Sequence, residues 1–150
     1  MPLLSRKTDY ALLILSYLNQ RPGCAREVAD RFHLSRAFVA NILKELCHKG
    51  FVTSHRGVKG GYVLARPADE VRLVEVIESL DESFRFAECN HPDDDACLIA
   101  PTCPLKGPVA EIHRRIREVL SDLSLADVFG KPDAVPELLE LTVLEPVLAN

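Results

Sequence analysis

Apolar residues recur at helical spacing through the first fifty residues, and this pattern predicts three helices separated by short breaks. The first spans Thr8–Leu18 and stops where a proline and a glycine follow. A short second helix spans Ala25–Phe32, and a tight turn leads to Ser35, a good N-cap for the third. The third helix is expected to run to about Lys49 and to end at a glycine. This arrangement is a helix-turn-helix, which also occurs in proteins that bind no DNA.

The apolar positions of the three helices are expected to face one core. They are Tyr10, Leu13, Ile14, Tyr17, Leu18, Val28, Ala29, Phe32, Phe38, Val39, Ile42, Leu43 and Leu46. The opposite face of the third helix begins with small and polar residues, which let a helix enter a major groove closely. We therefore expect Ser35, Arg36, Asn41 and Lys44 to contact DNA.

A glycine-rich hairpin is predicted after the third helix. Phe51–His55 and Tyr62–Ala65 are typical of strands, and the tip between them, Arg56–Gly61, carries Arg56 and Lys59. Glycines permit a positive φ and a close backbone approach, so the two cations can reach phosphates or a minor groove. A nucleotide-binding loop is the competing interpretation, but no Gly-Lys-Ser/Thr pattern follows and no helix begins there. A DNA-binding wing is favoured.

Charge divides the chain in two. Residues 1–66 hold eleven Lys/Arg and four Asp/Glu, a net of +7, whereas residues 67–150 hold seven and eighteen, a net of −11. The sum is the formal net charge of −4. A basic segment in an acidic chain indicates a polyanionic partner for that segment, and double-stranded DNA is the partner that the helix-turn-helix favours.

The second half is expected to form a connecting helix, Val71–Leu80, and a long helix with Pro108 in its first turn. Ser124 is expected to cap a short last turn, Leu125–Phe129. The long helix carries an apolar stripe at three- and four-residue steps that resembles a heptad seam, and we expect it to pair with a second copy. The stripe consists of Val109, Ile112, Ile116, Val119, Leu120 and Leu123.

These patterns predict a mainly α fold with a small β-hairpin wing: a winged helix-turn-helix plus a long C-terminal dimerisation helix. The expected parts are a DNA-binding head (1–66), a connecting helix with a cysteine-rich loop (67–107), a dimerisation helix with its last turn (108–130) and a tail without an assigned role (131–150). A two-fold dimer would place two third helices about one DNA turn apart, the geometry that reads a palindromic operator.

Three cysteines, Cys89, Cys97 and Cys103, lie within fifteen residues of a segment rich in proline and aspartate. Soft thiolates select zinc, copper(I) or iron–sulfur clusters. The intervals of seven and five residues lack the short pair that is typical of structural zinc, which lowers zinc without excluding it. Candidates for a fourth ligand are Glu88, His91, Asp93, Asp94 and Asp95. The remaining cysteines, Cys24 and Cys47, lie in the helical head and are not expected to be ligands.

Three motifs, at Lys7–Leu12, Arg56–Arg66 and Glu88–Cys103, strongly resemble the Rrf2 (Rrf-two) family of transcription regulators. The Ser124–Val128 segment fits the same pattern, and the resemblance covers roughly residues 1–130. It is greatest to the IscR, NsrR and RirA types and to regulators of SUF cluster assembly. The resemblance implies a homodimeric winged-helix protein whose iron–sulfur cluster, 2Fe–2S or 4Fe–4S, tunes its affinity for DNA.

Carried over by residue, the resemblance implies that Cys89, Cys97 and Cys103 are the cluster thiolates. The IscR type has a histidine three residues after its last cysteine, but this chain has Lys106 there. In the NsrR type an aspartate of the first helix reaches the partner's cluster, and Asp9 matches it. Asp9 in trans is thus the favoured fourth ligand, with His91 as the runner-up; an ordinary N-terminal helix carboxylate is the other interpretation of Asp9.

The function expected is a regulator, acting as a repressor, whose cluster senses nitric oxide, redox state or iron and cluster status. The alternative is a cluster-free thiol or zinc sensor on the same DNA-binding scaffold. The five histidines are scattered without a Ser/His/Asp or paired-carboxylate pattern, so no enzyme is expected. No apolar run is long enough for a membrane span and no signal peptide is apparent, so a cytoplasmic protein is expected.

Overall fold

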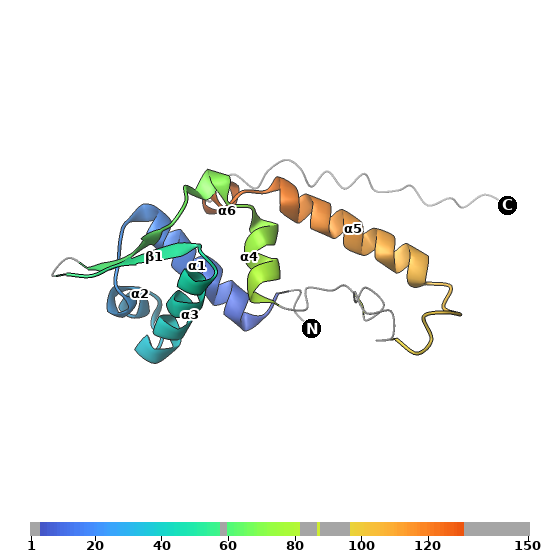
Figure 1. The fold of residues 1–150 in the computed structure, drawn as a ribbon, viewed down its shortest axis with the longest axis horizontal. Helices are drawn as coiled ribbons and strands as arrows, with labels where there is room; N and C mark the ends of the chain where they lie inside the picture. The colour runs from blue at the N-terminus through green and yellow to red at the C-terminus, as the bar shows by residue number, and fades with distance from the viewer. Residues whose placement is uncertain (1–3, 58–59, 82–86, 88–96, 131–150) are drawn as a thin grey trace.

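The computed structural model describes residues 4–57, 60–81, 87 and 97–130. This part of the chain is mainly helical with one two-stranded antiparallel sheet, which confirms the predicted fold class (Figure 1). None of its helices is long and apolar enough to cross a membrane. The helix-turn-helix and the hairpin form a head, from which one long helix extends.

Three helices form the body of the head. The first, α1 (Arg6–Gln20), begins at Ser5, whose hydroxyl accepts a hydrogen bond from the Thr8 backbone N–H at 3.2 Å. The next two, α2 (Ala25–Phe32) and α3 (Arg36–His48), match the predicted ranges closely. Because His33 adopts the left-handed conformation with φ 54°, α2 ends there and the chain reverses into α3.

The core lies where α1, α2 and α3 meet, and most of the predicted apolar positions are buried in it. Its buried members in these helices are Ala11, Ile14, Leu15, Tyr17, Leu18, Val28, Ala29, Val39, Ile42, Leu43 and Leu46. Two predictions were wrong. Leu13 is 41% exposed and Phe38 is 36% exposed, and the Phe38 ring packs edge-on against Tyr10 with centroids 5.1 Å apart. Both positions lie at the margin of the apolar stripe, and the contact with Tyr10 covers only part of the Phe38 side chain.

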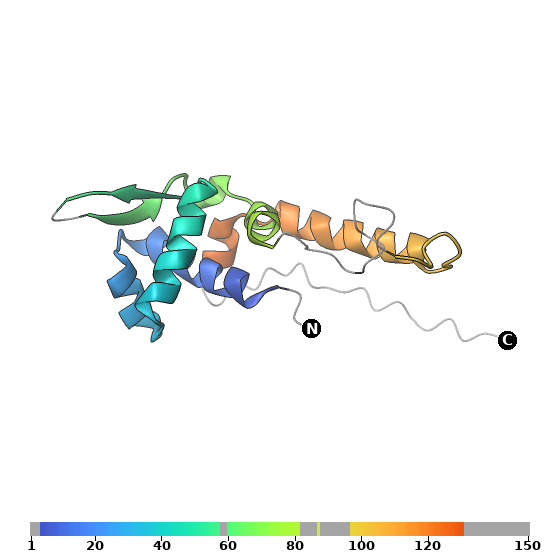
Figure 2. The same ribbon diagram turned by 60° about the horizontal axis from the view of Figure 1, so that its bottom comes forward.

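The hairpin pairs β1 (Val52–His55) with β2 (Gly61–Leu64) in an antiparallel register that aligns Ser54 with Tyr62. Strand β2 is joined to the turn between α1 and α2, since Gly23 and Tyr62 exchange two backbone hydrogen bonds of 3.2 and 2.8 Å. The free end projects from the head on the side opposite to the long helix (Figures 1 and 2). The wing is thus held against the helix-turn-helix.

The second half begins with a short 3-10 helix, η1 (Ala68–Glu70), and α4 (Leu73–Leu80), which packs on α1. The long helix α5 (Lys106–Asp122) begins two residues earlier than Pro108, and α6 (Leu125–Phe129) follows it at the predicted position. Two backbone hydrogen bonds of 2.8 Å fasten the C-terminal end of α5 to the start of α4: Leu73 donates to Leu123, and Leu125 donates to Val71. The N-terminal end of α5 lies far from the head (Figures 1 and 2).

Candidate functional site

Helix α3 presents the four residues that the sequence predicts as DNA contacts. Ser35 caps the helix, accepting a hydrogen bond from the Phe38 backbone N–H at 3.2 Å, and Ser35, Arg36, Asn41 and Lys44 are all exposed. The opposite side of the helix is buried in the core. Helix α3 therefore has a rigid support and a solvent-facing surface of polar and cationic groups, as a helix that enters a major groove requires.

The wing supplies a second basic group. Arg56 follows β1 directly and is exposed, and Gly57 beyond it has a φ of 126°, a conformation that a side chain would strain. The Gly60 backbone N–H donates to the Gly57 carbonyl at 2.8 Å, which closes the tip. Lys59, the other predicted wing contact, lies outside the described residues.

Two of the three predicted cluster thiolates lie in the described part of the chain. Cys97 and Cys103 are free, half-buried thiols in the turns that precede α5. The Cys97 carbonyl accepts a hydrogen bond from Ala100 at 3.0 Å, and the Cys103 carbonyl accepts one from Lys106, the first residue of α5, at 3.4 Å. Cys89 and His91 lie outside the described residues. The described donor set is thus two soft thiols attached to one end of α5.

Asp9 is exposed in the first turn of α1. The described part of the cysteine segment, residues 97–105, lies at the far end of α5, and both views place it well away from α1 (Figures 1 and 2). Within the described ranges, no three His, Cys, Asp or Glu side chains gather closely enough to hold a metal ion. Helix α1, which carries Asp9, and the described thiols therefore lie apart within one chain, and the ligation of a second chain's cluster by Asp9 stays a prediction.

The remaining two cysteines have local roles in the head. Cys24 is the N-cap of α2, and its backbone N–H donates to Glu27 at 2.7 Å, a hydrogen bond that lowers the pKa of the Glu27 carboxyl. Burial raises the pKa of the Cys47 thiol, which makes it a weaker nucleophile and a weaker ligand at neutral pH. The exclusion of Cys24 and Cys47 from the ligand set stays a prediction.

Helix α5 buries none of its residues, although it is amphipathic. Ile112 is 42% exposed and Val119 is 60% exposed, in the stripe that the sequence predicts as a dimer seam. Glu111 on the polar side accepts hydrogen bonds from Arg114 and Arg115 at 2.7–2.8 Å. An apolar stripe left uncovered on an ordered helix suits a second protein surface.

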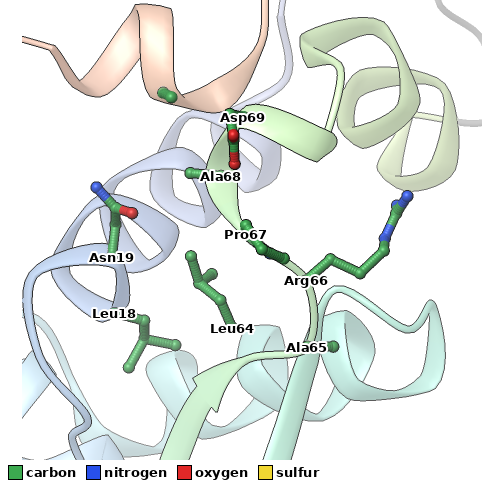
Figure 3. A pocket seen from close by; sticks show the side chains of 9 residues that line it. Leu18, Asn19, Leu64, Ala65, Arg66, Pro67, Ala68 and Asp69 are labelled. Atoms are coloured by element: carbon green, nitrogen blue, oxygen red, sulfur yellow. The ribbon is translucent and has the colours of Figure 1, made fainter.

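A cavity of about 700 Å³ lies between the head and α6 (Figure 3). Its lining is mostly apolar or backbone, with Asn19, Arg66 and Asp69 as its polar side chains. Arg66 points aside, and its guanidinium pairs with Glu75 at 2.8 Å. Few polar groups therefore remain to orient a small ligand, and we assign the cavity no role.

Three long-range contacts near these sites carry no sequence signal. The Ser5 backbone N–H donates to Asp81 across 76 positions, Lys7 pairs with Glu45 at 3.0 Å, and Arg117 pairs with Glu78. Each joins charged or polar residues of types that are ordinarily solvated, so periodicity and motifs say nothing about them.

The comparisons with known proteins agree with this geometry. Residues 4–131 match the Rrf2 family model, described as an iron-dependent transcriptional regulator. The transcriptional regulator NsrR of Oceanobacillus iheyensis is 30% identical over 148 residues, covering 96% of this chain and 99% of the relative. The solved structure of CymR, the global cysteine regulator of Bacillus subtilis, superposes with a TM-score of 0.68 at 26% identity, covering 86% of this chain and 97% of the other. The T. potens IscR structure gives 0.65 at 26% identity, covering 83% and 84%.

Proposed function

The chain belongs to the Rrf2 family of DNA-binding transcriptional regulators, and we propose that it is a homodimer whose DNA affinity is set by an iron–sulfur cluster. It is a regulator and not an enzyme. The observation that carries the proposal is the attachment of Cys97 and Cys103 to the free end of α5, a helix whose other end is hydrogen-bonded to the head. A structural change at the cysteines can therefore be transmitted along α5 to the DNA-binding elements.

The uncovered stripe on α5 supports the dimer. Ile112 and Val119 expose apolar surface in a single chain, and pairing two such helices would bury it. A two-fold axis perpendicular to α5, which pairs the two helices antiparallel, would carry one chain's cysteine segment toward the head of the other chain. It would also set two copies of α3 at a fixed spacing for a palindromic operator.

DNA contact is assigned to α3 and the wing. Arg36 and Lys44 supply cations on the exposed side of α3, Asn41 can make a two-point contact with an adenine, and Arg56 reaches from the wing toward phosphates or a minor groove. Lys59 is also proposed as a DNA contact, on the basis of its position in the sequence of the wing tip. Together with Ser35, these residues provide phosphate contacts that position the protein and side chains that read the base edges.

For the cluster we propose Cys89, Cys97 and Cys103 as ligands, with Asp9 of the second chain completing the set. When bound, the cluster would supply thiolate-ligated iron that reacts with nitric oxide or oxygen and is lost when iron is scarce. Asp9 would hold the first turn of α1 at one distance from the partner, and loss of that tie would release it. Because half-site spacing is strict, a small shift between the two α3 helices weakens binding strongly, and derepression results.

Metal analysis and a binding curve test this proposal. Protein purified without oxygen should be brown, with a sulfide-to-iron ratio near one, and should bind its operator with a different Kd from protein stripped by a chelator. Colourless protein that takes up no iron on anaerobic reconstitution, with DNA binding retained, would instead support the thiol or zinc sensor on the same scaffold. Equal affinities of loaded and stripped protein would refute control by the cluster.

The fourth ligand has its own test. Replacing Asp9 with alanine should alter the cluster's absorption spectrum or speed its decay in air, because one ligand would be replaced by solvent or an external donor. Asp30→Ala, which removes an exposed carboxylate from α2, is the matched control. An unchanged spectrum and decay rate in Asp9→Ala would remove Asp9 from the ligand set and leave His91 to be tested next.

A further inference from the structure

We propose that Asp81 is a positioning residue that couples the cysteine segment to helix α3 through the first turn of α1. The inference rests on the proposed function and names the internal route by which the state of the cysteine segment reaches the DNA-reading helix. It is carried by contacts among the described residues that join the end of α4, the start of α1 and the middle of α3.

The first contact joins α4 to α1. The Ser5 backbone N–H donates to the Asp81 carboxylate at 3.2 Å, and Ser5 is also the N-cap of α1. The Ser5 hydroxyl donates in turn to Thr8, whose side chain is fully buried. Burial by itself would raise the pKa of Asp81, but hydrogen bonds from Ser5 and Thr8 and the charge of Lys7 outweigh it and lower the pKa. The carboxylate is therefore ionised at neutral pH and held by the start of α1.

The second contact joins α1 to α3. Lys7 lies two residues after Ser5, in the same helical turn, and its ammonium pairs with the Glu45 carboxylate at 3.0 Å. Both side chains are more than half buried, so the pair is screened less than a pair at the open surface. Glu45 follows Lys44, one of the proposed DNA contacts, on α3. A displacement of the first turn of α1 is thereby transmitted to the part of α3 that bears Lys44.

Asp81 lies at the end of α4, where the chain continues toward the cysteine segment. It is the C-cap of α4, and its backbone N–H donates to the Ile77 carbonyl at 2.8 Å. Cys89 follows only eight positions later in the sequence. The same helix is tied to α5, because Glu78 pairs with Arg117. The end of α4 therefore connects to the cysteine segment through the chain and to the C-terminal half of α5 through Arg117.

The first turn of α1 also holds Asp9, whose backbone N–H donates to the Ser5 carbonyl at 3.0 Å. The first turn of α1 is thus contacted by Asp81 of the same chain and, in the proposed function, its Asp9 ligates the partner's cluster. The Lys7–Glu45 pair joins this turn to α3. The turn changes DNA affinity only if the protein binds DNA differently in the two positions of the turn, and the following experiment measures that difference.

The test compares the ratio of operator Kd values for stripped and cluster-loaded protein in the wild type, Asp81→Ala and Asp81→Asn. We expect Asp81→Ala to reduce the ratio at least about five-fold, the lower end of allosteric couplings. Asp81→Asn, which keeps an acceptor and loses the charge, should show a smaller effect and guards against misfolding of the alanine variant. Asp69→Asn, on η1 away from the first turn of α1, is the control and should keep the wild-type ratio.

The outcomes separate the two proposals. A wild-type ratio of one refutes the proposed function and this inference together. A wild-type ratio well away from one that both Asp81 variants retain leaves the proposed function standing and overturns the role of Asp81. A purely structural cap would lower the thermal midpoint of both forms equally and leave the ratio unchanged.

Hydrogen–deuterium exchange on the stripped full-length protein provides a readout that needs no cluster. In Asp81→Ala the amides of the first turn of α1 and of α3 around Glu45 should exchange several-fold faster than in the wild type, while those of α6 should not change. Faster exchange in α1 alone, with α3 unaffected, would show that the route stops at α1 and would overturn the inference.

Discussion

Gly23 shows how one residue joins the helix-turn-helix to the wing. A Cβ at this position would lie 2.5 Å from Cε1 of Tyr17, a buried ring that also packs edge-on against Phe32 and under the Arg21 guanidinium. The backbone of Gly23 must come this close because it exchanges two hydrogen bonds with Tyr62 of β2. The absence of a side chain is thus a requirement of packing and not of backbone conformation.

We therefore expect Gly23→Ala to lower the free energy of unfolding by about 1–3 kcal/mol, the usual cost of overpacking. Urea denaturation followed by circular dichroism measures it. Gly107→Ala is the matched control, since a Cβ at that position would have nothing within 4 Å and alanine favours a helix, so this variant should be unchanged or up to about 1 kcal/mol more stable. Equal effects of the two substitutions would contradict the packing argument.

At the scale of the element, α5 is held to α4 near its C-terminal end and is supported along its length by ion pairs on its own surface. Arg114 lies between Glu111 and Glu118 and pairs with both, while Arg115 also donates to Glu111. The hydrogen bonds from Arg114 and Arg115 lower the pKa of Glu111 from its ordinary 4.5 to about 2. These pairs lie three and four residues apart on one helical face and support the helix locally.

Because the pKa of Glu111 is lowered in the folded state, its ion pairs stabilise α5 fully above about pH 4.5 and are lost as the pH falls toward 2. Glu111→Gln should therefore have a lower thermal midpoint than the wild type at pH 6, and the difference should shrink as the pH falls from 4.5 to 2. Circular dichroism melts across this range provide the measurement. A difference that grows on acidification would show that Glu111 is not ion-paired in solution.

The apolar stripe of α5 predicts self-association. Val119→Glu should convert the dimer into a folded monomer, because a charge would be buried in the seam without a partner. Sedimentation velocity over a range of concentrations measures the state. Ala110→Glu adds the same charge on another side of α5, where the residue is also exposed, and should leave the dimer intact. A dimer in both variants would place the interface elsewhere.

At the scale of the whole molecule, the DNA-binding elements lie together at one end. The head, with its excess of basic residues, carries α3 and the wing, and α5, in which four Lys/Arg nearly balance three Asp/Glu, extends away from it. A protein arranged in this way can approach DNA head first.

Salt dependence of operator binding tests this arrangement. Each of Arg36→Ala, Lys44→Ala and Arg56→Ala should weaken binding and reduce the magnitude of the slope of log K against log salt by about one, if the residue contacts a phosphate. Arg115→Ala on α5 removes the same type of charge far from the head and should leave the slope unchanged. If Arg56→Ala leaves affinity and slope untouched, the wing does not contact DNA.

Local pattern determined most of the fold. The ranges of α2 and α3, the strands of the wing and the cap at Ser124 follow from helical periodicity, glycine positions and capping side chains, all of which act over a few residues. The exposed face of α3 could be predicted in the same way, since burial of one side of a helix places the other in solvent. The cysteines could be recognised as candidate ligands by type, and that assignment stays a prediction, since Cys89 lies outside the described residues.

Only the tertiary structure decided which surfaces are covered and which distant residues meet. Leu13 and Phe38 look like core residues, yet they are exposed because burial depends on whether another element lies over that part of the helix. The contacts of Asp81 with Ser5 and of Lys7 with Glu45 join residues 76 and 38 positions apart, and polar pairs of this kind leave no periodic trace. The separation of α1, which carries Asp9, from residues 97–105 in one chain likewise follows from the direction of α5, whose C-terminal end is hydrogen-bonded to the start of α4.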